Sequence, residues 1–167
     1  MAYAYAPSLN EGATDDELAL GRDHAARAAR LSDSDTPRSH QLLVAAIAEA
    51  FSGDPAHFAG TMRKACEEID VANGRGPGPS VTCKALLAEA LLKQTPWNYY
   101  TSPIDKGGEG GRLIKSTMDH RSLVPTAAEA KGLLGGVLAG NTKHPLGLHL
   151  WVVSEKDTTN NTRRRLD

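Results

Sequence analysis

The sequence is poor in aromatic residues, and its charges almost cancel. Aromatic side chains make up 5% of the 167 residues, so the core must rely on alanine, leucine, valine and isoleucine, whose small size favours close helix packing. The formal net charge is -1, from 19 basic and 20 acidic residues, so no global field attracts nucleic acid or an anionic membrane. Composition and length therefore predict an ordinary globular protein of one domain.

Cysteine is also scarce, and the two residues present, Cys66 and Cys83, belong to no Cys-x-x-Cys or Cys/His ligand pattern. Both fall on predicted helix faces. We expect buried thiols there, with a disulfide between neighbouring helices as the alternative. Among the histidines, His144 and His149 are the closest downstream pair, but their separation matches no common ligand spacing. No metal site is therefore predicted.

Long apolar runs are missing as well. No run reaches the roughly 18 residues needed to cross a bilayer. The first residues lack the basic segment and apolar stretch of a secretion signal. We therefore expect a cytoplasmic protein, or a component of a soluble assembly, without membrane contact.

The first half of the chain contains four helical patterns separated by short breaks. Thr14 and Glu17 form a capping box, Asp54 with Pro55 gives a cap followed by a first-turn proline, and Ser80 can cap a later helix. Connections this short favour antiparallel neighbours, so residues 14–94 predict a helical bundle. Its helices are expected at 14–31, at 37–51 with Thr36 as the cap, at 55–72 and at 81–94.

The stretch from Gln41 to Phe51 is apolar on nearly every side, with only Gln41 and Glu49 polar. A helix of this kind must be covered by protein rather than by water. The other three helices show narrower apolar stripes. We therefore expect this helix at the centre of the bundle, with Val44 and Ile47 almost fully buried.

The third predicted helix has the clearest amphipathic pattern. Its polar surface carries charge pairs four residues apart, Arg63 with Glu67 and Lys64 with Glu68. Such pairs stabilise an exposed helix surface weakly. We expect them to be solvated rather than catalytic.

The chain changes character after residue 94. Thr126 and Glu129 match a second capping box, for a helix at 127–139. Residues 112–118 predict a short strand, and Leu146–Val153 alternates and is rich in strand formers. The expected fold is thus mainly α, a four-to-five-helix bundle with a small C-terminal strand–helix–strand extension. The expected boundaries are an N-terminal arm at 1–13, the bundle at 14–94, the extension at 95–153 and a polar tail at 154–167.

No motif converges on a catalytic site. The glycine spacing of Gly135–Thr142 resembles a phosphate-binding loop, but Asn141 stands where lysine belongs and the glycines end a predicted helix. The run Asp119-His120-Arg121 has no serine elbow or cysteine signature tied to it. The sequence therefore indicates no catalytic residue, no cofactor and no small-molecule substrate.

Two sets of residues are candidates for binding macromolecules. A cluster of aromatic side chains can anchor a protein partner. Arginines on the first helix and at the end of the chain can reach the phosphates of nucleic acid. The partner-binding set is Trp97, Tyr99 and Tyr100, and the nucleic-acid set is Arg22, Arg27, Arg30, Arg163, Arg164 and Arg165.

The aromatic cluster, the two arms and the missing catalytic set favour a non-enzymatic interaction or assembly protein. Such a protein would be a small accessory subunit of a larger complex or a homo-oligomer. Two alternatives stay open. One is a nucleic-acid-associated accessory factor that uses the arginines, and the other is an enzyme whose site is assembled from distant residues.

Overall fold

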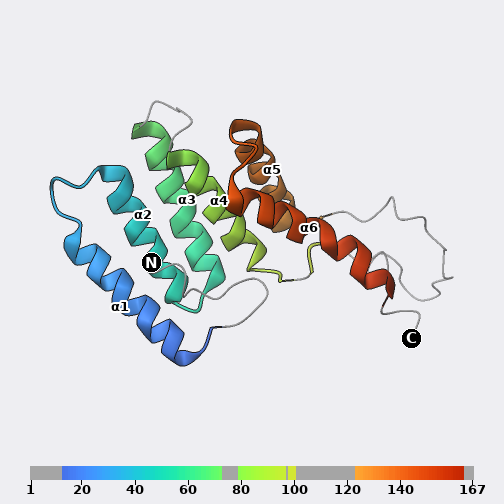
Figure 1. Ribbon diagram of the computed structural model, residues 1–167, viewed down its shortest axis with the longest axis horizontal. Coiled ribbons are helices and arrows are strands. Elements are labelled where there is room, and N and C mark those ends of the chain that lie inside the picture. The colour runs from blue at the N-terminus through green and yellow to red at the C-terminus, as the bar shows by residue number, and fades with distance from the viewer. Residues whose placement is uncertain (1–12, 73–78, 97, 101–122, 164–167) are drawn as a thin grey trace.

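Helices that follow one another in the sequence pack side by side (Figure 1). The computed structural model describes residues 13–72, 79–96, 98–100 and 123–163, and their side chains except at 72, 79–80 and 155–163. The elements are α1 (Asp15–Leu31), α2 (Arg38–Ala48), the short 3-10 helix η2 (Glu49–Phe51), α3 (Pro55–Ala72), α4 (Pro79–Leu92), α5 (Pro125–Gly140) and α6 (Pro145–Arg163). The mainly helical fold is therefore confirmed.

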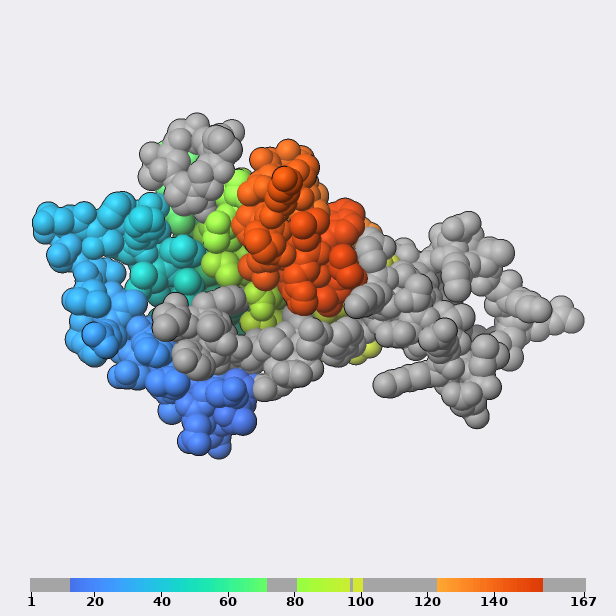
Figure 2. Space-filling view, in the orientation of Figure 1, coloured from blue at the N-terminus to red at the C-terminus, as the bar shows by residue number. Residues whose placement is uncertain are grey.

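The centre of the core is α4 rather than the helix that begins near Gln41. Every residue from Ala85 to Leu92 is buried. Because consecutive residues point in different directions around a helix, α4 is covered on all sides. From the viewing side of Figure 2, α4 shows only as a narrow light-green strip between its neighbours. One hydrophobic cluster joins residues of α2, α3, α4, α5 and α6, so the segment after residue 94 shares the core of the bundle.

The expectation that Val44 and Ile47 are almost fully buried is wrong. Both are only partly buried, and Ala46 is the one residue of α2 that is fully enclosed. The outer neighbour of α2 is α1, whose buried residues are Gly21 and Ala25. Because the apolar stripe of α1 is this small, α1 covers only part of the surface of α2.

Local start signals place two of the helices as expected. The backbone N–H of Glu17 donates to Thr14 Oγ1 at 3.3 Å, and the backbone N–H of Thr14 donates to Glu17 Oε2 at 2.8 Å. This is the predicted capping box. At α3, Asp54 Oδ1 accepts the N–H groups of Ala56 and His57 at 2.9 and 3.0 Å.

Three predicted caps are not used. Ser80 lies inside α4, which begins at Pro79. At α2 the N-cap is Pro37, and Thr36 Oγ1 instead accepts the N–H of Asp33 at 3.2 Å. At α5 the helix begins at Pro125 with Val124 as its N-cap, while Thr126 Oγ1 lies 3.5 Å from Thr95 Oγ1. Proline in the first turn fixes the start of α5 two residues earlier than the capping box suggests.

The strand expected at Leu146–Val153 is wrong, because this stretch belongs to α6. Its buried residues, Gly147, Leu150 and Val153, recur every three positions, as on one face of a helix. The N–H of Gly147 donates to His144 Nδ1 at 3.1 Å and closes the first turn. The same helix continues to Arg163, into the segment expected to be a tail.

The other strand expected, at 112–118, lies outside the described residues, as does the arm before residue 13. Within the described ranges, β-type pairing is limited to an isolated antiparallel bridge between Tyr100 and Leu123. The strand–helix–strand extension is therefore replaced, as far as the structure describes it, by two helices packed on α4.

Gly21 brings α1 into close contact with Phe51. A Cβ atom there would lie 2.7 Å from Cζ of the buried Phe51 ring. We expect Gly21→Ala to lower the free energy of unfolding by about 1–3 kcal/mol, measured by urea denaturation. Gly60→Ala is the control, because its Cβ meets nothing within 4 Å in the middle of α3. The control should raise the free energy of unfolding by about 0.5–1 kcal/mol, and a matching gain at Gly21 would contradict the close approach.

The capping box also controls a pKa. The backbone N–H and the hydroxyl of Thr14 hold the pKa of Glu17 below its ordinary value of 4.5. Because the pKa is lowered in the folded chain, this contribution to stability is present above pH 4.5 and is lost as the pH falls through the lowered value. Thr14→Ala removes the hydroxyl but keeps the N–H, so NMR titration should show the pKa of Glu17 rising part of the way back. An unchanged pKa would show that the hydroxyl contributes nothing.

Candidate functional site

The predicted aromatic cluster is divided between core and surface. Tyr99 is 0% exposed and belongs to the hydrophobic cluster, whereas Tyr100 is partly buried. The N–H of Val124 donates to the carbonyl oxygen of Tyr99 at 2.9 Å, which ties this segment to the start of α5. Trp97 lies outside the described residues. The Tyr99 ring therefore offers no surface to a partner, and partner binding by this segment stays a prediction.

The predicted arginine set is not gathered in one place. Arg22, Arg27 and Arg30 are exposed on α1, but the same helix carries four acidic residues, Asp15, Asp16, Glu17 and Asp23. Arg163 is the last residue of α6, at the opposite end of the molecule (Figure 1), and Arg164 and Arg165 lie outside the described residues. The acidic residues offset the attraction of α1 for phosphate, so nucleic-acid binding stays an untested prediction.

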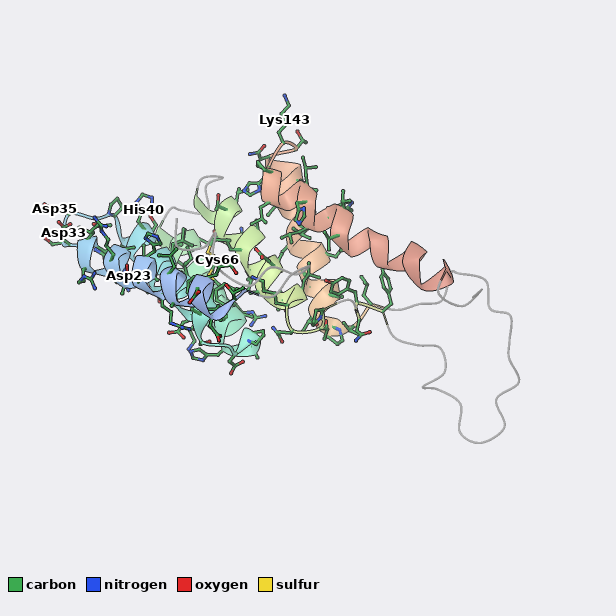
Figure 3. All side chains as sticks on the ribbon, turned by 60° about the horizontal axis from the view of Figure 1, so that its bottom comes forward. Asp23, Asp33, Asp35, His40, Cys66 and Lys143 are labelled. Carbon is green, nitrogen blue, oxygen red and sulfur yellow. A yellow bond between two sulfur atoms is a disulfide. The ribbon has the colours of Figure 1, made fainter. Side chains whose placement is uncertain are left out.

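A groove lined with charged side chains lies where α3, α4 and α5 meet. We call it the α3–α5 groove; its volume is about 220 Å³ and it opens to solvent. In Figure 3 the labelled Cys66 lies inside the row of helices, away from the edge where Asp33 and Asp35 project. The groove is lined by Arg63, Cys66, Glu67, Asp70, Lys84, Leu87, Glu129 and Leu133.

Two ion pairs join the helices around this groove. The Arg63 guanidinium donates to both carboxylate oxygens of Glu129, at 2.8 and 2.9 Å, and so links α3 to α5. Lys84 Nζ lies 3.0 Å from Asp70 Oδ2 and links α4 to α3. All four side chains are partly exposed, so each pair stabilises the fold by at most about 1 kcal/mol. Neither pair is the four-residue pair expected within α3.

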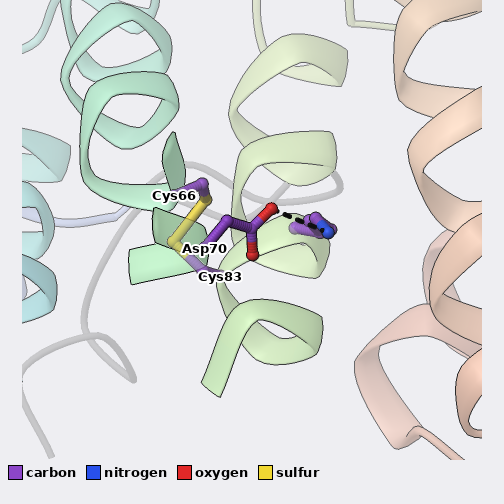
Figure 4. The surroundings of a disulfide bond; sticks show 4 residues. Cys66, Asp70 and Cys83 are labelled. Carbon is purple, nitrogen blue, oxygen red and sulfur yellow. Dashed lines mark ion pairs between the residues drawn. A yellow bond between two sulfur atoms is a disulfide. The ribbon is translucent and has the colours of Figure 1, made fainter. Parts of the chain in front are cut away.

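The two cysteines form a disulfide between α3 and α4 (Figure 4). The expectation of separate thiols is therefore wrong. The Cα atoms of Cys66 and Cys83 are 5.6 Å apart, within the range that a disulfide spans. Antiparallel packing across a short connection brings the last turns of α3 to the first turns of α4, so the two apolar stripes place the sulfurs together.

Asp70 lies beside this disulfide, one helical turn after Cys66 (Figure 4). While Oδ2 faces Lys84, Oδ1 is shielded from solvent and has no hydrogen-bond partner in the described structure. Buried carboxylate oxygens are nearly always hydrogen-bonded. Sequence reasoning missed this residue, although the four-residue spacing from Cys66 to Asp70 on one helix was a visible signal.

A second open groove, of about 410 Å³, runs between α2 and α3 on the other side of α3. We call it the α2–α3 groove. Its apolar lining comes from Leu42 and Val71, and Val71 is 80% exposed. Arg38 Nη2 lies 3.3 Å from Glu68 Oε2 at the edge, and Glu67 completes the lining.

Two features are absent from the described residues, a cluster of possible metal ligands and a helix able to span a membrane. No three histidine, cysteine, aspartate or glutamate side chains there gather into a possible metal site. Likewise, no helix in the described part of the chain is both long and apolar enough to cross a membrane.

No protein-family model, no curated protein and no solved structure matches the chain. A function must therefore be argued from its own residues and their arrangement.

The disulfide should contribute strongly to stability. It closes a loop with a sequence separation of 17. We expect Cys66→Ala with Cys83→Ala to lower the free energy of unfolding by up to about 3 kcal/mol in urea denaturation. Reduced wild-type protein is the control, because it lacks the disulfide but keeps the packing of both cysteine side chains. Its free energy of unfolding should fall by most of the amount seen in the double variant. Identical unfolding curves for oxidised and reduced wild type would contradict the assignment.

Proposed function

We propose that this protein is a non-enzymatic interaction subunit that binds a protein partner through the α2–α3 groove. The observation that carries the proposal is the exposure of Val71, which leaves 80% of a valine in water on the wall of a groove. Burial of an exposed valine side chain is worth about 1.5 kcal/mol, so a partner that covers Val71 gains binding energy. Leu42, which is only partly buried, extends the apolar surface across the groove.

The charges around this apolar surface indicate what the partner presents. The edge carries two carboxylates, Glu67 and Glu68, and one guanidinium, that of Arg38. Because Arg38 already pairs with Glu68, the edge keeps a net negative charge at Glu67. An apolar centre with a polar rim is the usual anatomy of a protein interface. The partner should therefore offer an apolar side chain next to a lysine or arginine.

The two alternatives have less support. Binding of nucleic acid at this groove is opposed by its net negative edge, and on α1 by the acidic residues of the same helix. For an enzyme, both grooves are open to solvent, whereas catalytic sites generally enclose their substrate. No observation of comparable weight favours either alternative.

The test replaces Val71 by aspartate and follows complex formation. We expect wild-type protein isolated from its native source to carry a bound protein, and Val71→Asp to weaken that complex at least about ten-fold, because a charge replaces an apolar contact. If the partner is a second copy, light scattering of the pure protein will show a dimer that Val71→Asp converts to a monomer.

Val152→Asp is the matched control, because Val152 is a half-exposed valine on α6, away from the groove. It should leave the complex intact. Loss of the partner with Val152→Asp instead would place the binding surface on α6. A wild-type chain that stays monomeric and binds no protein would contradict the proposal as a whole.

A further inference from the structure

The carboxylate of Asp70 lies beside the disulfide, and one of its oxygen atoms lacks a hydrogen-bond donor. Asp70 Oδ1 is shielded from water and has no donor, although Oδ2 of the same carboxylate lies 3.0 Å from Lys84 Nζ. A disulfide has no hydrogen to donate, so the neighbouring Cys66–Cys83 bond cannot supply one (Figure 4). A buried acceptor without a donor destabilises the state in which it occurs. The oxidised chain is therefore the state that carries this defect.

We propose that Cys66–Cys83 is a reversible thiol–disulfide site, and that Asp70 shifts its equilibrium toward the reduced form. Reduction turns each sulfur into an S–H group, which can donate a hydrogen bond. An S–H beside Asp70 gives Oδ1 the donor that it lacks in the disulfide form. Hydrogen bonds to an ionised acceptor are stronger than neutral ones, so the gain belongs to the reduced state alone.

The α3–α5 groove reaches one of the two cysteines. Cys66 lines this groove and is 5% exposed, whereas Cys83 is 0% exposed and does not line it. The reductant is therefore a low-molecular-weight thiol that attacks Cys66 Sγ. A protein reductase, which must cover the sulfur with its own surface, fits a groove of about 220 Å³ poorly.

The reaction balances with two equivalents of such a thiol. The first thiolate bonds to Cys66 Sγ and breaks the bond to Cys83 Sγ, which leaves with the electron pair and takes up a proton. The second thiolate bonds to the sulfur of the first reductant and releases Cys66 Sγ, which is protonated in turn. The two reductant thiols become one disulfide, and their two protons end on Cys66 and Cys83. Oxidation by a small disulfide runs through the same steps in reverse.

The proposal is tested by the equilibrium of the folded chain with dithiothreitol. Wild type, Asp70→Ala and Glu67→Ala are each equilibrated over a range of ratios of reduced to oxidised dithiothreitol, then alkylated and counted for free thiols. We expect Asp70→Ala to shift the equilibrium about ten-fold toward the disulfide, since the reduced form loses its hydrogen bond and the oxidised form loses its defect.

Glu67→Ala is the matched control, because Glu67 is also a carboxylate of α3 in the same groove. Its equilibrium should equal that of wild type. Equal equilibria for wild type and Asp70→Ala, or an equal shift in both variants, would overturn the proposal. These outcomes are independent of whether a partner binds the α2–α3 groove.

A second measurement uses wild type alone, in case Asp70→Ala does not fold. Circular dichroism follows the helices while the disulfide is reduced, and infrared spectroscopy follows the S–H stretch of the reduced chain. We expect helical content to persist and one S–H band to lie below that of free cysteine in water, as a hydrogen bond to a carboxylate requires. Reduction that occurs only as the helices unfold, or two S–H bands without this shift, would overturn the proposal.

Discussion

The burial of α4 on every side is the constraint on which the other helices depend. Its residues Ala85–Leu92 are all enclosed, and most are leucine or alanine, so α3, α5 and α6 must cover it. The polar exception is Glu89, whose carboxylate lies 3.0 Å from Lys93 Nζ one turn later. A buried carboxylate is tolerated only when it is paired, so this ion pair lets α4 keep a charge within the core.

Burial decreases with distance from α4 along the row of helices. Next to α4, α3 contributes Phe58, Met62 and Ile69 to the core, whereas α2 contributes only Ala46 as a fully buried residue. Further out, α1 is held by the close contact of Gly21 with Phe51. Surface left for a partner therefore lies on the α2 side of α3 rather than around α4. That is where the exposed Val71 stands.

The position of α3 between two neighbours explains why its last turns line two different grooves. Successive residues of a helix are rotated by about 100°, so Asp70 and Val71 cannot face the same neighbour. Asp70 lies in the α3–α5 groove beside the disulfide, and Val71 lies in the α2–α3 groove. Glu67, one turn earlier, lines both. The disulfide thus holds to α4 the same stretch of α3 that borders the proposed binding surface.

Signals that act within a few residues were readable from the sequence. The capping box at Thr14 and the cap at Asp54 mark the starts of α1 and α3, because a cap needs only the first turn of its own helix. The central helix was assigned wrongly because the helix at 81–94 was given a narrow apolar stripe, although residues 85–92 are apolar on nearly every side, as are residues 41–51. Only the neighbouring helices decide which of the two stretches is covered. Valine and tryptophan in α6 favour a strand locally. The segment is nevertheless helical, because His144 and Pro145 start a helix and its packing on α5 outweighs the local strand preference.

The ion pairs in the grooves could not be predicted from the sequence, because they too depend on how the helices pack. Spacing alone pairs Arg63 with Glu67 and Lys64 with Glu68, because these residues lie one turn apart on α3. In the structure Arg63 binds Glu129 of α5 through both carboxylate oxygens, and Glu68 pairs with Arg38 of α2. A bidentate contact between helices is stronger than a solvated pair within one helix. Each groove therefore takes its charges from the packing of neighbouring helices. The unpaired oxygen of Asp70 is likewise a consequence of packing, because only the fold places that carboxylate beside a disulfide.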